Sequence, residues 1–197
     1  MMRYLSPVAG LSNLTELSFF VNQVSDISPV SELTNLTYLN FSGNPQISDI
    51  SPVAGLTNLT YLSFFADNVI NGNIKDISPV AGLTNLTRLS LNSNQISDIS
   101  AVAKLTKLTW LGLTDNQISS IDSVAGLTNL IELNLSHNQI SDIKPLVDNI
   151  GLGNGDIVSL YTPYLGVPLS ATSCTVLYST VGKQRGNSEA WLPVNRG

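Results

Sequence analysis

The sequence contains few cysteines and few charged residues. Cys174 is the single cysteine among 197 residues, so no disulfide can form within the chain, and we interpret it as a small apolar filler. Charged residues make up 12% of the chain and hydrophobic residues 43%, a balance typical of ordered rather than disordered chains. The composition therefore predicts a folded protein without a disulfide framework.

Positive charge is scarce as well. Nine Lys and Arg stand against 14 Asp and Glu, which gives a net charge of −5. Such a chain lacks the electrostatic footprint for nucleic acid or an anionic membrane. No apolar stretch approaches the roughly 18 residues that span a bilayer, and the start of the chain is not a signal peptide. We expect no nucleic-acid partner, no membrane insertion, and either a cytoplasmic chain or the interior of a longer exported one.

Leucine, in contrast, is abundant and strictly periodic. The segment that begins at Leu11 returns at steps of 22, 23, 27, 22 and 22 residues, from Leu33, Leu56, Leu83, Leu105 and Leu127. Each unit reads Leu-x-x-Leu-x-x-Leu-x-Leu/Phe-x-x-Asn-x-Ile-x-x-Ile-x-Pro-Val. A fixed period of this length predicts similar coils stacked along one axis, without a single central core.

The unit from Leu83 to Ser100 shows how one coil is expected to fold. Residues 87–91 alternate polar and apolar, which predicts a half-buried strand with Leu89 and Leu91 inward. Asn94 follows at a turn, where a buried amide can bond backbone groups that have no strand partner. Its equivalents are Asn22, Asn44, Asn116 and Asn138, while the third unit has Asp67 next to Asn68.

A short helical turn is expected on the opposite wall of each coil. Ser-Pro pairs at 28, 51 and 78 predict Ser as the N-cap and Pro as the first helical residue. Gly55, Gly82 and Gly126 are expected to close these turns, in a left-handed conformation where one is needed. The predicted fold class is therefore an α/β solenoid, curved, with a parallel β-sheet on the concave face and short helical turns on the convex face.

These units resemble the leucine-rich repeat. The phrases Leu-Thr-Asn-Leu and Asn-Gln-Ile-Ser-Asp-Ile-Ser-Pro-Val are most similar to internalin-like bacterial repeats, and the resemblance covers about residues 5–145. It implies a protein-binding scaffold rather than an enzyme, displayed on a cell surface if the chain is part of a longer exported protein. The alternative is a structural or adhesive spacer within a larger surface protein, because fold alone does not give function.

Candidate binding residues lie where the outward strand positions fail to repeat. Aromatic side chains flanked by charge have the composition of protein-binding hot spots. The alternative interpretation is that these residues have no binding role and are present because aromatic side chains suit strand surfaces. The predicted ligand-binding residues are Tyr38, Tyr61, Phe65, Arg88, Trp110, Glu132 and Phe20, and the partner is expected to be a protein or peptide.

Catalytic and metal-binding patterns are not found in the sequence. No Ser-His-Asp arrangement, phosphate-binding glycine loop or carboxylate pair stands out, so we expect no enzyme and no cofactor. His137 is the only histidine and is interpreted as a surface polar residue. One aspartate per coil does not make a calcium loop, and we interpret these residues as solvated turn carboxylates: Asp26, Asp49, Asp76, Asp98 and Asp142.

The chain divides into a regular and an irregular part. We expect the array over residues 1–150, and a degenerate last repeat with an irregular tail over 151–197, where residues 156–160 predict one more strand. The longer third unit carries its extra residues within 66–73, as a ligand-contacting loop or a tolerated insertion.

Both ends of the chain depart from the pattern. The array starts in the middle of a repeat, and this uncapped apolar edge predicts a fragment, a missing domain or a self-association surface, which light scattering would distinguish. Residues 176–185 have no period. We hypothesise that they are a frameshifted closing helix, and the nucleotide sequence would test this.

Overall fold

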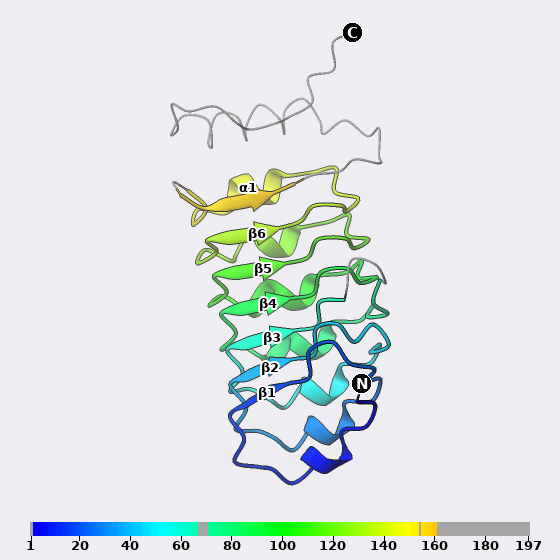
Figure 1. Ribbon diagram of the computed structural model, residues 1–197. Helices are drawn as coiled ribbons and strands as arrows, with labels where there is room; N and C mark the ends of the chain where they lie inside the picture. The colour runs from blue at the N-terminus through cyan, green and yellow to red at the C-terminus, as the bar shows by residue number, and fades with distance from the viewer. Residues whose placement is uncertain (1, 67–70, 154, 161–197) are drawn as a thin grey trace.

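Seven short strands form one parallel sheet in chain order (Figure 1). The structure, a computed structural model, describes residues 2–66, 71–153 and 155–160. The strands are β1 (Glu16–Ser18), β2 (Tyr38–Asn40), β3 (Tyr61–Ser63), β4 (Arg88–Ser90), β5 (Trp110–Gly112), β6 (Glu132–Asn134) and β7 (Ile157–Ser159). The strand expected at residues 156–160 is thus confirmed as β7.

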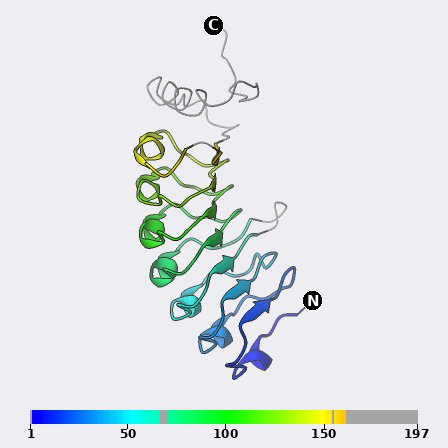
Figure 2. The same cartoon turned by 90° about the vertical axis from the view of Figure 1, so that its left-hand side faces the viewer.

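Helical turns form the opposite wall of the stack. They are η1 (Ser6–Val8), η2 (Ser28–Val30), η3 (Ser51–Val53), η4 (Ser78–Gly82), η5 (Ser100–Lys104) and η6 (Asp122–Val124), all 3-10, and α1 (Lys144–Asp148). Seen from the side, the stack bends with the helical turns outside and the strands inside (Figure 2). The predicted curved α/β solenoid, with strands on the concave face and helical turns on the convex face, is therefore confirmed (Figure 2).

The core is a set of apolar columns between the two walls. The inward leucines of the middle strands, Leu39, Leu62, Leu89, Leu111 and Leu133, are fully buried. In the first three coils phenylalanines fill the next inward position, and Phe41 stacks on Phe19 and Phe64 with ring centroids 5.9 and 5.8 Å apart. Each coil therefore buries its apolar side chains against its neighbours, as the period predicted.

A ladder of buried asparagines links successive coils. The Nδ2 of Asn116 donates to the carbonyls of Leu113, in its own coil, and Leu91, in the preceding coil, both at 3.0 Å. Its Oδ1 accepts the N–H of Ile96 at 3.0 Å. Asn44, Asn94 and Asn138 repeat this pattern, and Asn22 bonds its own coil and the N–H of Met2 in the same way. The predicted role of these asparagines is confirmed.

The third coil has Asp67 and Asn68 in place of the ladder asparagine, and these two residues lie outside the described part of the chain. In the second coil, the N–H of Ile47 donates to the backbone oxygen of Asn44 at 3.2 Å. The described end of the longer segment in the third coil forms hydrogen bonds with the second and fourth coils. The Gly72 N–H donates to the Ser93 carbonyl at 2.7 Å, and the Asn73 side chain donates to the Pro45 carbonyl at 2.9 Å.

A second ladder, made of threonines, precedes the strands. The Thr109 hydroxyl donates to the Thr87 carbonyl at 3.2 Å, and Thr37, Thr60 and Thr87 each bond the preceding coil in the same way. The sixth coil has Ile131 at this position, and its side chain is 56% exposed. The repeated threonines therefore act as inter-coil links, a role that sequence reasoning did not assign to them.

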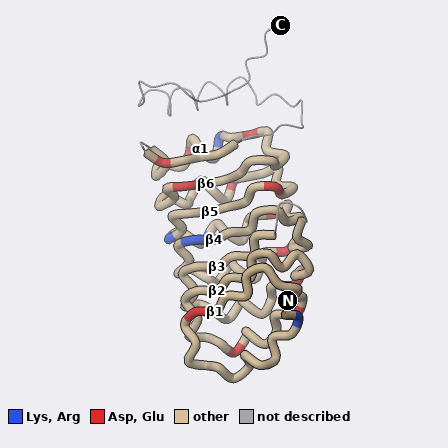
Figure 3. The backbone as a smooth tube through the Cα atoms, viewed as in Figure 1, with Lys and Arg blue, Asp and Glu red and all other residues tan. Residues whose placement is uncertain are grey.

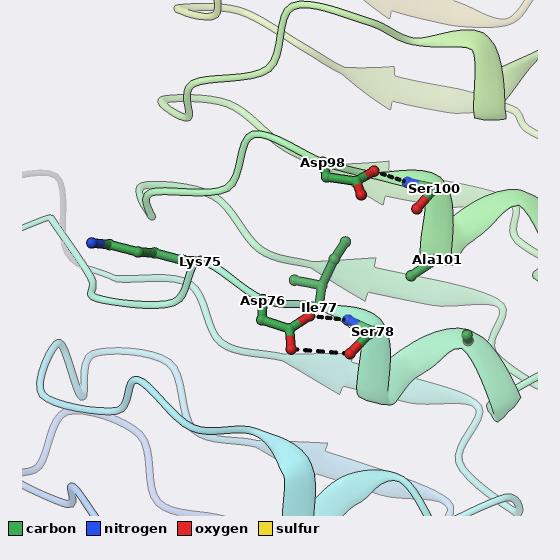
Figure 4. A pocket seen from close by; sticks show the side chains of 8 residues that line it. Lys75, Asp76, Ile77, Ser78, Asp98, Ser100 and Ala101 are labelled. Atoms are coloured by element: carbon green, nitrogen blue, oxygen red, sulfur yellow. Dashed lines mark hydrogen bonds between the residues drawn. The ribbon is translucent and has the colours of Figure 1, made fainter.

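At four of the described helical turns an aspartate side chain accepts the backbone N–H of the first helical serine. Asp76 and Asp98 each accept the backbone N–H of the serine two residues later at 2.7 Å (Figure 4). The predicted N-cap role of Ser28, Ser51 and Ser78 is wrong. Serine is the first helical residue, Pro the second, and the preceding isoleucine occupies the cap without a side-chain bond. The carboxylate of an Asx turn reaches this N–H and is favoured near a helix start.

The predicted left-handed role of Gly55, Gly82 and Gly126 is also wrong, because none of them has a positive φ. The left-handed conformation occurs instead just before the ladder asparagines, at Val21, Gly43, Ser93, Asp115 and His137, and also at Gly10 and Gly155. The backbone turns sharply there, which directs the next side chain inward. Four of these residues in the described part of the chain, Val21, Ser93, Asp115 and His137, are not glycine, so the backbone is strained there.

The first coil covers its apolar residues less than the others do. Leu11 is 49% exposed, whereas the equivalent leucines from Leu33 to Leu127 are fully buried. Self-association through this edge stays a prediction, as does the division at residue 150. The hypothesis of a frameshifted helix concerns residues outside the described part of the chain.

We predict that Asn116→Ala lowers the free energy of unfolding by roughly 3 kcal/mol, because it leaves buried carbonyls and an N–H without partners. Asn129→Ala is the matched control. Its exposed side chain makes one bond, to the Thr106 carbonyl at 2.8 Å, and the loss should stay under about 1 kcal/mol. Urea denaturation measures both variants, and equal losses would contradict the ladder.

The turn aspartates predict a loss of stability in acid. Hydrogen bonds from the serine two residues later, chiefly its backbone N–H, hold the pKa values of Asp26, Asp49 and Asp98 below their ordinary value. A lowered folded-state pKa gives stability that is present above the unfolded pKa, about 3.9, and is lost as pH falls through the folded value. The stability difference between wild type and Asp98→Ala should be constant from pH 5 to 8 and shrink below about pH 4. A difference that persists to about pH 2 in urea titrations would refute this assignment.

Candidate functional site

One row of side chains crosses the solvent-facing side of the sheet, which is the concave face of the stack. The row lies where each strand begins. The strands pair in register, so the first residues of consecutive strands stand side by side. Their spacing is about 4.8 Å, the distance between paired strands. The outer row consists of Glu16, Tyr38, Tyr61, Arg88, Trp110 and Glu132.

Two tyrosines form the first contact within the outer row. The rings of Tyr38 and Tyr61 stack with centroids 4.3 Å apart and planes 14° apart. The Asn40 side chain donates to the Tyr38 hydroxyl at 3.3 Å. Burial, with Tyr38 adding to it, raises the pKa of Tyr61 above its ordinary value. Like an ordinary tyrosine, Tyr61 is protonated at neutral pH and keeps its hydroxyl donor.

Arg88 and Trp110 form the second contact. The Arg88 guanidinium carbon lies 5.2 Å from the centroid of the Trp110 ring, within the range of a cation–π interaction. The indole in turn lies against Gly112, where a Cβ atom would come within 2.4 Å of Cη2 and 2.8 Å of Cζ3. The absence of a side chain at residue 112 thus lets the indole lie directly against the backbone of that residue.

Small polar residues form the floor beside the tyrosines. Ser63 and Ser42 are 2% and 5% exposed, and their hydroxyl oxygens are 2.6 Å apart. At the far end of the outer row, the Asn134 side chain donates to a Glu132 carboxylate oxygen at 2.9 Å. These polar side chains beside the outer row are therefore already hydrogen-bonded, to each other or to Glu132.

Charge along the outer row is sparse and ordered. Glu16 and Glu132 lie at the two ends, on β1 and β6, and Arg88 lies between them on β4 (Figure 3). Among the strands β1 to β7, Arg88 is the only Lys or Arg. The tyrosine pair separates Arg88 from Glu16, and Trp110 separates it from Glu132.

Not all predicted site residues come together. Phe20 and Phe65 lie two residues beyond the ends of β1 and β3, and Phe20 is 59% exposed. Within the described residues, no ring contact joins either of them to the tyrosines. Gly112 is the residue that sequence reasoning overlooked. The only signal was that it is a single glycine among serines and asparagines at the same strand position.

The single histidine of the chain lies outside the outer row. His137 pairs through Nδ1 with a carboxylate oxygen of Asp115 at 2.8 Å, at the turn after the strands. Among the described residues there is no group of three or more His, Cys, Asp or Glu that could hold a metal ion. The same part of the chain holds no helix with the length and apolarity needed to cross a bilayer.

Comparison with protein families identifies the repeats. A family model described as leucine rich repeats (2 copies) matches residues 12–55, 57–104 and 106–148. A comparison with curated protein sequences gives no match.

Solved structures with the same arrangement include two internalins of Listeria monocytogenes. Internalin C2 is 39% identical with a TM-score of 0.72, over 80% of this chain and 66% of its own. Internalin F is 38% identical with a TM-score of 0.62, over 79% of this chain and 50% of its own. The chain therefore spans two thirds or less of these relatives.

A more distant structure shares the fold alone. It is the leucine-rich repeat ectodomain of the plant membrane receptor kinase GASSHO1/SCHENGEN3 from Arabidopsis thaliana, in complex with Casparian strip integrity factor 2. It is 22% identical with a TM-score of 0.66, over 80% of this chain and 20% of its own.

The family model covers most of the chain, and both internalin structures share more than a third of the aligned residues. Together with the curved stack and its asparagine ladder, these matches show that the chain is an internalin-like member of the leucine-rich repeat family.

Proposed function

We propose that the chain is a protein-interaction module that binds a protein or peptide on its concave strand face. The observation that carries this proposal is the outer row. In-register pairing brings Tyr38, Tyr61, Arg88 and Trp110 together, although each comes from a different repeat. The residues that hold the coils together repeat, and these do not.

The geometry supports recognition because its side chains are already ordered. The stacked tyrosines and the indole held against Gly112 lose little rotamer freedom when a partner covers them. Tyr, Trp and Arg are the residues most enriched in the energetic centres of protein interfaces. The plant receptor ectodomain, in complex with its factor, supports partner binding as a use of this fold.

The internalin relatives support a finer proposal, a bacterial protein displayed at a cell surface. The alternative function is a structural or adhesive spacer, in which the aromatic residues only suit the strand surface. A spacer requires no partner on the concave face. Variants of the outer row therefore separate the two functions.

We expect the double variant Tyr61→Ala/Trp110→Ala to lose partner capture by about a hundredfold, because two aromatic anchors are removed from one row. The measurement is a pull-down with the immobilised chain, followed by titration of the captured protein. Tyr4→Ala is the matched control, since Tyr4 is an aromatic residue 80% exposed and away from the sheet. Unchanged capture by the double variant would favour the spacer.

Gly112→Ala tests whether the contact between the indole and Gly112 shapes the binding face. The added methyl group would overlap Trp110 and also lie 2.9 Å from Asn92 Nδ2, so the indole should swing into solvent and weaken partner binding about tenfold. The emission of Trp110 should shift to longer wavelength in a Trp191→Phe background, where Trp110 is the only tryptophan. Gly126→Ala is the control because its Cβ would meet open space. An unchanged spectrum would mean that the indole does not depend on residue 112.

A further inference from the structure

The guanidinium of Arg88 is an uncommitted cation on the outer row. Arg88 is exposed, and its contact on the described chain is the face of Trp110. No hydrogen bond or ion pair recorded within the described residues joins the guanidinium to a carboxylate. A guanidinium has five N–H donors, so one side of the group rests on the indole while its donors remain available.

The glutamates of the outer row do not neutralise Arg88. Glu132 is two strands away and Glu16 three strands away, so their backbone positions lie about 10 and 14 Å from that of Arg88 at the usual strand spacing. Neither glutamate forms an ion pair with Arg88 among the described residues. Glu132 also accepts a hydrogen bond from Asn134. Arg88 is therefore a local positive site within an acidic chain.

We propose that the outer row recognises an extended peptide segment that carries an acidic side chain on Arg88 and an apolar side chain on the Tyr38–Tyr61 pair. This inference rests on the proposed function and specifies the chemistry of its partner. The acidic side chain supplies the carboxylate that matches the fork of the guanidinium. The apolar side chain covers the stacked tyrosine rings.

The spacing of the outer row defines the separation of the two peptide residues. Measured between backbone positions, the centre of the tyrosine pair lies one and a half strand spacings from Arg88, or about 7 Å. Side chains on the same side of an extended peptide, at positions i and i+2, are about 6.7 Å apart. A segment that crosses the strands thus places an acidic residue on Arg88 and an apolar residue, two positions away, on the tyrosines.

The carboxylate belongs to a side chain within the segment rather than to a free chain end. The outer row continues on both sides of Arg88, with Trp110 on β5 and Tyr61 on β3. A segment that covers both aromatic surfaces must pass Arg88 in its interior. The indole then flanks the salt bridge and excludes water from it, which strengthens the attraction.

The test is a selection from a library of random dodecapeptides displayed with blocked carboxyl ends. The probe protein is the full chain, immobilised as wild type, Arg88→Gln, Arg88→Glu and Tyr61→Ala/Trp110→Ala. We expect wild type to enrich Asp or Glu two positions from an aromatic or aliphatic residue. Arg88→Gln should lose the acidic preference, and Arg88→Glu should select Lys or Arg there instead. Lys104→Gln is the matched control, because Lys104 is an exposed cation on η5, on the opposite wall.

A double-mutant cycle measures the contact directly. The best selected peptide and its Glu→Gln or Asp→Asn version, both as C-terminal amides, are titrated against wild type and Arg88→Gln. Each single change should weaken binding about tenfold, and the second change should add almost nothing to the first. The tenfold effect of the acidic residue should also decrease with added salt.

The outcomes separate this inference from the proposed function. Peptides that need Tyr61 and Trp110, but lack an acidic preference and bind Arg88→Gln normally, would overturn the inference and leave the binding face intact. Independent, additive effects in the cycle would overturn it as well. Failure of wild type to select any peptide that depends on Tyr61 and Trp110 would overturn the inference together with a peptide-binding function.

Discussion

The buried asparagine of each coil is the interaction on which the rest of the structure depends. A coil that turns from strand to helical wall leaves carbonyl and N–H groups inside the protein, and burying them unpaired would cost free energy. Asn116 satisfies such groups in its own coil and in the preceding one. The same side chain therefore closes one coil and joins it to the next.

Left-handed residues precede the buried asparagines, while the turn aspartates satisfy backbone groups at the start of the helical turns. A positive φ at Ser93 or Asp115 precedes the asparagine whose side chain turns inward, so local strain is offset by buried hydrogen bonds. On the opposite wall, the Asp98 carboxylate accepts the N–H of Ser100, the first residue of the helical turn. The coil repeats because its turns and its buried polar groups have to be satisfied every time.

A rigid repeating framework leaves the outward strand positions free to vary. Leucines, threonines and asparagines hold the stack, while the first outward position holds tyrosine, arginine, tryptophan or glutamate. In-register pairing then turns residues 22 to 27 positions apart in sequence into neighbours about 4.8 Å apart. Substitutions at the outward strand positions can therefore change what the face binds without changing the fold.

The sequence by itself determined the period, the inward leucines, the bonding role of the asparagines and the parallel sheet, because each follows from spacing and local chemistry. It also identified Tyr38, Tyr61, Arg88 and Trp110 as outward residues. Only the tertiary structure decided that the tyrosines stack on each other, that Arg88 lies over Trp110, and that Gly112 accommodates the indole. It also showed that aspartate, not serine, accepts the N–H at the start of the helical turns, and that left-handed residues precede the asparagines. These features depend on side-chain rotamers and on backbone direction between neighbouring coils, and a repeat pattern read along one chain does not contain them.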